Sequence, residues 1–190
     1  SQTLLFILTL MLAGVLLSNF IEERGNKVIE VLAAAAPVSA IFTGKLFAML
    51  GSSLIGIAVW AAAALAGLSL LPHQTGAMPD PAVGWPAFVL LFALYFSSNY
   101  LLVGALLLGV GAQASSVRQI QTLSLPITMA QLLLYGLASA ALNQPGSSMA
   151  LAAAVFPFSS PLAMIAWAVE QTDIWPHALA LCWQGLWVAV

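Results

Sequence analysis

Long apolar stretches without a charged side chain are the feature that most constrains how this chain can fold. Residues 3–20, 46–71, 86–111 and 120–142 contain no Asp, Glu, Lys or Arg. A helix needs about 20 mostly apolar residues to cross a bilayer, and it satisfies its own backbone hydrogen bonds there. A membrane barrel would alternate apolar and polar residues, and no such alternation is seen. The sequence therefore predicts an all-α, polytopic membrane bundle that forms a single transmembrane domain over residues 1–190.

Proline-rich and polar breaks divide the chain into five expected spans, at about residues 3–20, 41–71, 86–111, 120–142 and 175–190. Pro126 lies inside the fourth span and, because it lacks a backbone N–H, should bend that helix. The stretch 149–169 is long enough to cross a membrane, but the segment Phe156–Pro161 splits it. Each half alone is too short to span.

The positions of the basic residues predict which loops face the cytoplasm. Arg24, Lys27 and Lys45 follow the first span, and Arg118 follows the third. Positive residues in short loops favour the cytoplasmic side, so all four lie there. His73, Asp80 and the acidic residues Glu170 and Asp173 then face the other side, provided that residues 149–169 dip into the membrane and return. We therefore expect a re-entrant or interfacial hairpin over 149–169.

A charged island lies between the first two spans. Five of the charged residues fall within residues 22–30, namely Glu22, Glu23, Arg24, Lys27 and Glu30. On a helix, Val28, Val31, Leu32 and Ala35 form one apolar stripe opposite the charges. We expect an amphipathic helix over 22–36 that ends before Pro37. Such a helix either anchors a loop at the lipid surface or docks on a partner, and the pattern alone leaves both open.

The run Glu22–Lys45 resembles the cytoplasmic segment of ABC-2 type transporter permeases, in the branch that includes sodium-efflux ABC permeases. The matching features are an acidic pair, a basic residue, a Glu before an aliphatic pair, a Pro-Val-Ser turn and a Gly-Lys pair. They correspond here to Glu22 and Glu23, Lys27, Glu30 before Val31 and Leu32, Pro37 to Ser39, and Gly44 with Lys45. The Phe156–Pro161 break, followed by an apolar helix and an acidic Trp-Pro loop, resembles that family's outer hairpin.

The resemblance implies a six-span permease of which this chain holds the second span through part of the sixth. It implies that the island is a coupling helix that docks on a separate ATP-binding cassette subunit, and that a second permease copy or homologue completes the assembly. Ala33–Ala36 depart from the pattern, because bulkier residues often stand there. The expected partner-coupling residues are Glu22, Glu23, Arg24, Lys27, Glu30, Val31, Pro37 and Lys45.

The expected chemistry of the chain is transport and not catalysis. The sequence has no Gly-rich phosphate loop, so ATP and magnesium would bind the partner subunit and this chain would hold no cofactor. No spacing of His and Cys residues predicts a metal site, and we expect His73 and His177 to be interfacial residues. A net charge of -2 gives no reason to expect a nucleic-acid partner.

Polar residues near the middle of the third span, together with glutamines of the fourth, could line a substrate path. Helix-to-helix hydrogen bonding is the more common role of such residues in membranes. No ionisable residue lies deep in a span, which argues against a proton-relay transporter. The candidate path residues are Ser97, Ser98, Asn99, Tyr100, Gln121 and Gln131.

Together these features predict the multi-pass permease subunit of an ATP-driven ABC-2 exporter in a bacterial inner membrane. The alternative, from another class, is a non-ABC membrane scaffold or facilitator whose amphipathic loop binds the lipid bilayer. The generic polar patch does not identify a substrate, so ions, drugs, peptides and lipids all stay open.

Overall fold

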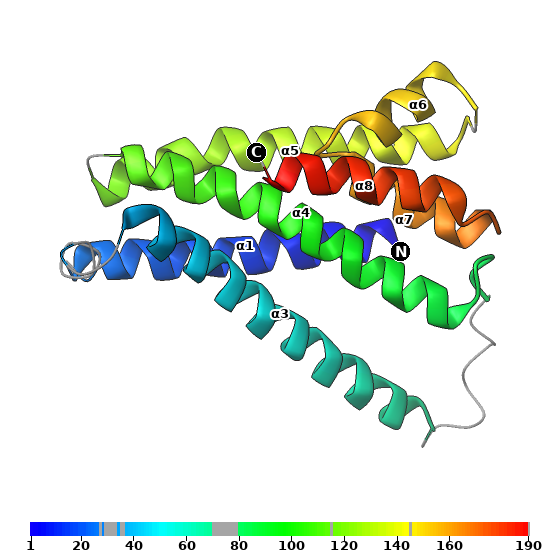
Figure 1. The fold of residues 1–190 in the computed structure, drawn as a ribbon, viewed down its shortest axis with the longest axis horizontal. Coiled ribbons are helices and arrows are strands. Elements are labelled where there is room, and N and C mark those ends of the chain that lie inside the picture. Colours follow the sequence, from blue (N-terminus) through cyan, green and yellow to red (C-terminus); the bar gives the residue numbers. More distant parts are fainter. Residues whose placement is uncertain are drawn as a thin grey trace.

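A computed structural model describes residues 1–26, 28, 34, 37–69, 80–114, 116–144 and 146–189. The described residues form helices and no strand (Figure 1). The helices are α1 (Gln2–Gly25), α3 (Val38–Ser69), α4 (Trp85–Gln113), α5 (Val117–Leu142), α6 (Ser148–Val155), α7 (Ser160–Glu170) and α8 (Trp175–Ala189).

Four of these helices, α1, α3, α4 and α5, are long and apolar enough to cross a membrane. The predicted all-α, polytopic membrane bundle is therefore confirmed. Helix α5 stays a single helix through Pro126. Ser116 begins α5 as its N-cap, because its side-chain oxygen accepts a hydrogen bond from the backbone N–H of Gln119 at 3.2 Å.

Helix α4 lies at the centre of the bundle and contacts α1, α3, α5, α7 and α8. Tyr95, Phe96 and Tyr100 are fully buried along it. Small residues farther along α4 let its neighbours approach closely. A Cβ atom added to Gly104 would lie 2.8 Å from Leu46 of α3 and 2.9 Å from Leu16 of α1. The core therefore depends on a glycine where three helices meet.

Helices α6 and α7 form a hairpin with a bend of 119° between them. Helix α5 ends and α8 begins at the same end of the bundle, on the right in Figure 1. The hairpin tip lies beside the second half of α8, where Trp183 Nε1 donates to the Val155 carbonyl at 2.7 Å and Gln184 Nε2 to the Pro157 carbonyl at 2.9 Å. The hairpin thus enters the bundle and returns to one end. Its depth in a bilayer stays a prediction.

Helix α3 diverges from the rest of the bundle along its length (Figure 1). Its first half packs on the core through Leu46 and Leu50, whereas Val59, Trp60 and Leu65 are exposed. It is the least buried of the four long helices. This divergence leaves an apolar groove between α3 and α1, which is lined by residues of these two helices.

Candidate functional site

The first residues of the charged island extend the first membrane helix. Helix α1 continues to Gly25 and is followed by Asn26, whose N–H donates to the Glu22 carbonyl at 3.0 Å. The separate amphipathic helix was expected to begin at residue 22, and this start is wrong because no helix-breaking residue lies between Phe20 and Gly25. Lys27, Glu30 and Val31 lie outside the described residues, as does most of the expected coupling helix over 22–36.

Arg24 binds the C-terminal end of α4. Its Nη1 atom donates to the Gly111 carbonyl at 2.6 Å and to the Ala112 carbonyl at 3.4 Å. Carbonyls in the last turn of a helix have no partner within the helix, and the negative end of the helix dipole attracts a cation. Arg24 therefore caps α4 from α1, and its guanidinium is directed toward the end of α4.

Lys45 pairs with Glu23 across the ends of α3 and α1. Lys45 Nζ lies 2.6 Å from a Glu23 carboxylate oxygen, with 12% of the Lys45 side chain and 40% of the Glu23 side chain exposed. Water and salt screen a pair with this exposure, so its contribution to stability is about 0.2 to 1 kcal/mol. Its structural effect is to fix the start of α3 beside the end of α1.

Together these contacts form a junction of three helices at one end of the bundle, and we call Glu23, Arg24, Lys45, Gly111 and Ala112 the three-helix junction. The island therefore joins α1 to both α3 and α4. Glu22 and Pro37 are exposed beside the junction. The Glu22 side chain makes no ion pair within the described ranges, so Glu22 and Pro37 are the expected coupling residues that stay accessible there.

The expected polar patch in α4 serves mainly the packing of the helices. Ser97 and Ser98 donate to carbonyls of their own helix, at 2.7 and 3.1 Å. Asn99 Nδ2 donates to Thr9 Oγ1 of α1 at 3.1 Å, and Asn99 is 1% exposed. Tyr100 is fully buried, next to α3. The hydrogen bond between Asn99 and Thr9 is the helix-to-helix contact that the sequence left as an alternative.

The two glutamines of α5 lie apart from that patch and from each other. Gln121 is exposed, whereas Gln131 is buried. Gln131 lines a cavity of about 160 Å³ between α1, α4 and α5, together with Ser124, Thr128 and apolar residues such as Leu107. The hydroxyls of Ser124 and Thr128 donate to carbonyls of their own helix. Gln131 thus brings an amide group to an otherwise mostly apolar cavity.

Several buried polar residues were not placed in the interior from the sequence, and Thr9, Gln184 and His177 are three of them. Thr9 is the partner of Asn99, Gln184 holds the hairpin tip, and His177 lies against Tyr95. His177 was expected at an interface, but it is 2% exposed and its Nδ1 lies 2.9 Å from the Tyr95 hydroxyl. His177 is therefore packed between α8 and α4, and its depth relative to the membrane interface stays a prediction. A single polar residue inside an apolar run was the signal available for Thr9 and Gln184.

The described residues contain no group of three or more His, Cys, Asp or Glu side chains that could hold a metal ion. The acidic and basic side chains of this part of the chain lie near the ends of the helices. The junction and the Gln131 cavity are two places in the described part of the chain where polar side chains gather.

Comparison with known proteins places this chain in a family. It is 26% identical over 163 residues to an uncharacterized protein of Methanocaldococcus jannaschii, a match that covers 85% of this chain and 38% of that protein. No solved structure matches the chain. The profile of a family described as ABC-2 family transporter protein matches residues 1–190. This chain is a multi-pass membrane protein that belongs to the ABC-2 transporter family.

Proposed function

We propose that this chain forms the permease part of an ATP-driven exporter, in which a separate cassette subunit binds magnesium and hydrolyses ATP. The observation that supports this most is the three-helix junction. The island expected to meet the cassette is joined to α3 through Lys45 and to α4 through Arg24. Membership of the ABC-2 family favours this function over a lipid-binding scaffold.

The junction offers a route by which a force on the island moves the membrane helices. Closure of the paired cassettes would push on the segment that follows α1. Because helices move as rigid elements, the push would tilt α1, and the bonds of Glu23 and Arg24 would transmit the tilt to α3 and α4. The chain itself supplies no catalytic group in this scheme.

The Gln131 cavity is the part of the proposed path that such a tilt would change. Its walls come from α1, α4 and α5, and two of these helices meet at the junction. Tilting of α1 against α5 would open or close the cavity around the Gln131 amide. Ser98 and Asn99 stay in the packed interior, and the bond from Asn99 to Thr9 holds α4 against α1. We propose that two copies of the permease, or a copy and a homologue, complete the path in a bacterial inner membrane.

Co-purification of the full-length permease with its cassette tests this function. We expect a tagged permease to retain a cassette ATPase, and we expect Glu30→Lys to lower the retained ATPase activity several-fold because it reverses a charge on the island. Glu170→Lys is the matched control, since Glu170 is exposed at the opposite end of the bundle. A permease that retains no cassette ATPase and changes no ATPase rate would exclude the exporter.

A further inference from the structure

The side-chain amide of Gln131 is buried and has no hydrogen-bond partner among the described residues. Gln131 is 3% exposed. Other unpaired atoms, such as Asn99 Oδ1 and Gln184 Oε1, are covered completely by protein, and the amide atoms of Gln131 are not among these. Because Gln131 lines the cavity between α1, α4 and α5, its amide is open to that cavity. A buried amide is rarely left unpaired, so the cavity holds a molecule that forms hydrogen bonds.

The cavity offers hydrogen-bond donors and acceptors but no charge. Ser124 Oγ donates to the Gln121 carbonyl at 2.8 Å and Thr128 Oγ1 to the Ser124 carbonyl at 3.2 Å, so both oxygens can still accept. The amide of Gln131 supplies an oxygen and an NH₂ group, and no charged side chain lines the cavity. A volume of about 160 Å³ has room for several water molecules.

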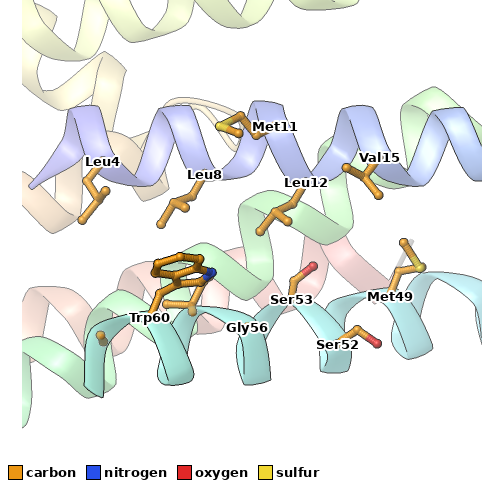
Figure 2. A pocket seen from close by; sticks show the side chains of 12 residues that line it. Leu4, Leu8, Met11, Leu12, Val15, Met49, Ser52, Ser53, Gly56 and Trp60 are labelled. Carbon is orange, nitrogen blue, oxygen red and sulfur yellow. The ribbon is translucent and has the colours of Figure 1, made fainter. Parts of the chain in front are cut away.

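The larger groove between α1 and α3 differs from this cavity. Figure 2 shows Leu8 and Leu12 of α1 facing Trp60 of α3 across that groove. The side chain of Val15 lines the same groove. Its walls are mostly apolar, so hydrocarbon can fill it without leaving an amide unpaired. The two faces of α1 therefore border surroundings of different polarity.

A polar stripe runs from the cavity along one face of α5. Its members recur at intervals of three or four residues, which places them on one side of a helix. They are Gln121, Ser124, Thr128, Gln131, Tyr135 and Ser139. Gln121 is exposed, near the end of α5 that begins beside the three-helix junction. From there to Gln131 is a distance of about 15 Å at 1.5 Å per residue.

On the other side of the cavity, contacts with α1 close the polar stripe. The Tyr135 hydroxyl is hydrogen-bonded to Thr3 Oγ1 at 2.8 Å, and its ring stacks on Phe6 with centroids 4.6 Å apart. Gln2 Nε2 donates to Ser139 Oγ at 2.8 Å. These contacts join α1 to α5 at one end and leave the polar stripe open toward the three-helix junction.

We propose that the Gln131 cavity is a hydrated site inside the membrane part of the bundle, filled by water that enters along the polar stripe from the junction end. This water donates to the amide oxygen of Gln131 and accepts from its NH₂ group, and it donates to the hydroxyl oxygens of Ser124 and Thr128. Hydrocarbon supplies neither kind of partner. The site goes beyond the proposed function, because it requires no ATP, cassette subunit or substrate.

Cysteine reactivity tests whether the cavity holds water. The full-length permease in a Cys182→Ala background carries Thr128→Cys or Met129→Cys, in phosphatidylcholine nanodiscs that leave both ends of the bundle open. Thr128 lines the cavity, whereas Met129 is exposed on α5 but does not line it. The probe is a cationic methanethiosulfonate, which reacts with the thiolate. We expect Thr128→Cys to react about 100-fold faster, because hydrocarbon excludes both charged partners.

A second pair of cysteines tests the opposite wall. Gly14 of α1 lines the cavity, and a Cβ atom there meets nothing within 4 Å, so Gly14→Cys fits. Val15→Cys is the matched control, since Val15 lines the apolar groove on the other side of α1. We expect the same order of rates in this pair, with Gly14→Cys the faster.

Variants of Gln131 test what holds the water. Gln131→Leu, combined with Thr128→Cys, should slow the reaction about fivefold or more, because the water loses the hydrogen bonds of the amide. Gln131→Asn keeps an amide and should restore most of the rate. An unchanged rate in Gln131→Leu would show that the amide does not hold water in the cavity, and it would count against the proposal.

Equal rates within both cysteine pairs would overturn the proposal. If all four cysteines react slowly, hydrocarbon or protein fills the cavity, and if all four react fast, water covers whole helix faces and not a site. All of these reactions are measured without ATP and without a cassette. Their outcome is therefore distinct from the retention of a cassette ATPase.

Discussion

Arg24 illustrates how one residue can belong to an interaction island and still serve the fold. Its guanidinium binds the carbonyls of Gly111 and Ala112 at the end of α4, where the helix has no donors of its own. Hydrogen bonds to a charged group are stronger than neutral ones, and here the bond joins helices that are far apart in sequence. Arg24 is therefore a positioning residue of the junction.

We expect Arg24→Ala to lower the free energy of unfolding by about 1 to 2 kcal/mol, below the upper range for charged hydrogen bonds because the site is partly exposed. In the full-length assembly, ATP hydrolysis should continue while transport falls, since α4 is no longer tied to α1. Equilibrium unfolding in detergent and paired assays of transport and ATPase activity measure the two effects. Arg118→Ala, at an exposed residue of the same end, is the control. Equal loss of transport in both variants would contradict the role of the junction.

Thr9 and Asn99 form a hydrogen bond inside the membrane part of the bundle. We expect Thr9→Val, which keeps the shape of the side chain, to destabilise the protein by about 0.6 to 1.7 kcal/mol. Ser97→Ala should have a smaller effect, because the Ser97 hydroxyl donates only to its own helix. Unfolding titrations of both variants in one detergent make the comparison. A Thr9→Val protein as stable as wild type would show that Asn99 finds another partner.

At the scale of elements, α4 organises the bundle through its small residues. Gly104 lies where Leu16 of α1 and Leu46 of α3 converge, whereas Gly109 faces outward and has nothing near its Cβ position. The absence of a side chain at Gly104 makes room for both leucines, so α1 and α3 both contact α4. The same residue type thus has a packing role at one position and none at the other.

We expect Gly104→Leu to destabilise the protein by about 2 kcal/mol or more, because the added side chain must displace two packed leucines. Gly109→Leu should be neutral or slightly stabilising, since leucine favours a helix over glycine by up to about 1 kcal/mol. The yield and unfolding midpoint of the two purified variants provide the measurement. If both variants lost a similar amount of stability, the effect of Gly104 would come from helix bending and not from packing.

The hairpin shows how a short helix can lie deep in a membrane protein. Nearly every residue from Ser160 to Ala168 in α7 is buried. The backbone groups freed at the bend are paired with protein, since Trp183 and Gln184 of α8 donate to carbonyls of the tip. Irregular backbone at membrane depth is stable only where protein or water satisfies it.

At the scale of the whole molecule, the two ends differ in charge. The junction and Arg118 bring basic residues to one end, whereas Asp80, Glu170 and Asp173 lie at the other. The backbone N–H of Val83 donates to the Ala168 carbonyl at 3.3 Å, which places the end of the hairpin beside the start of α4. The positive-inside rule then predicts that the junction faces the cytoplasm.

Accessibility of single cysteines tests this arrangement. In a Cys182→Ala background, Gln113→Cys should react with an impermeant maleimide only from the cytoplasmic side. Ser148→Cys and Asp173→Cys, exposed at the two ends of the hairpin, should both react only from the outside. Labelling of intact cells and of inverted vesicles distinguishes the sides. Reaction of Ser148→Cys and Asp173→Cys from opposite sides would show that residues 148–170 cross the membrane.

Much of the helical layout is predictable because its determinants are local. The apolar runs predict the four long helices, α1, α3, α4 and α5. Pro157 and Pro161 predict the break between α6 and α7. The sequence shows the island as a cluster of charges, but it does not show which residues of other helices these charges bind. Arg24 could not be paired with Gly111 from the sequence, since nothing in a helical period encodes which helix ends meet.

The sequence by itself determined that this protein is a bundle of membrane helices, because hydrocarbon admits long apolar segments only if each satisfies its own backbone. Only the tertiary structure decided the use of the polar side chains. It directed Arg24 and Lys45 toward other helices, buried His177 against Tyr95 and paired Asn99 with Thr9. It also left a groove between α1 and α3. These outcomes depend on helix direction and spacing, which are set when side chains of distant segments pack together.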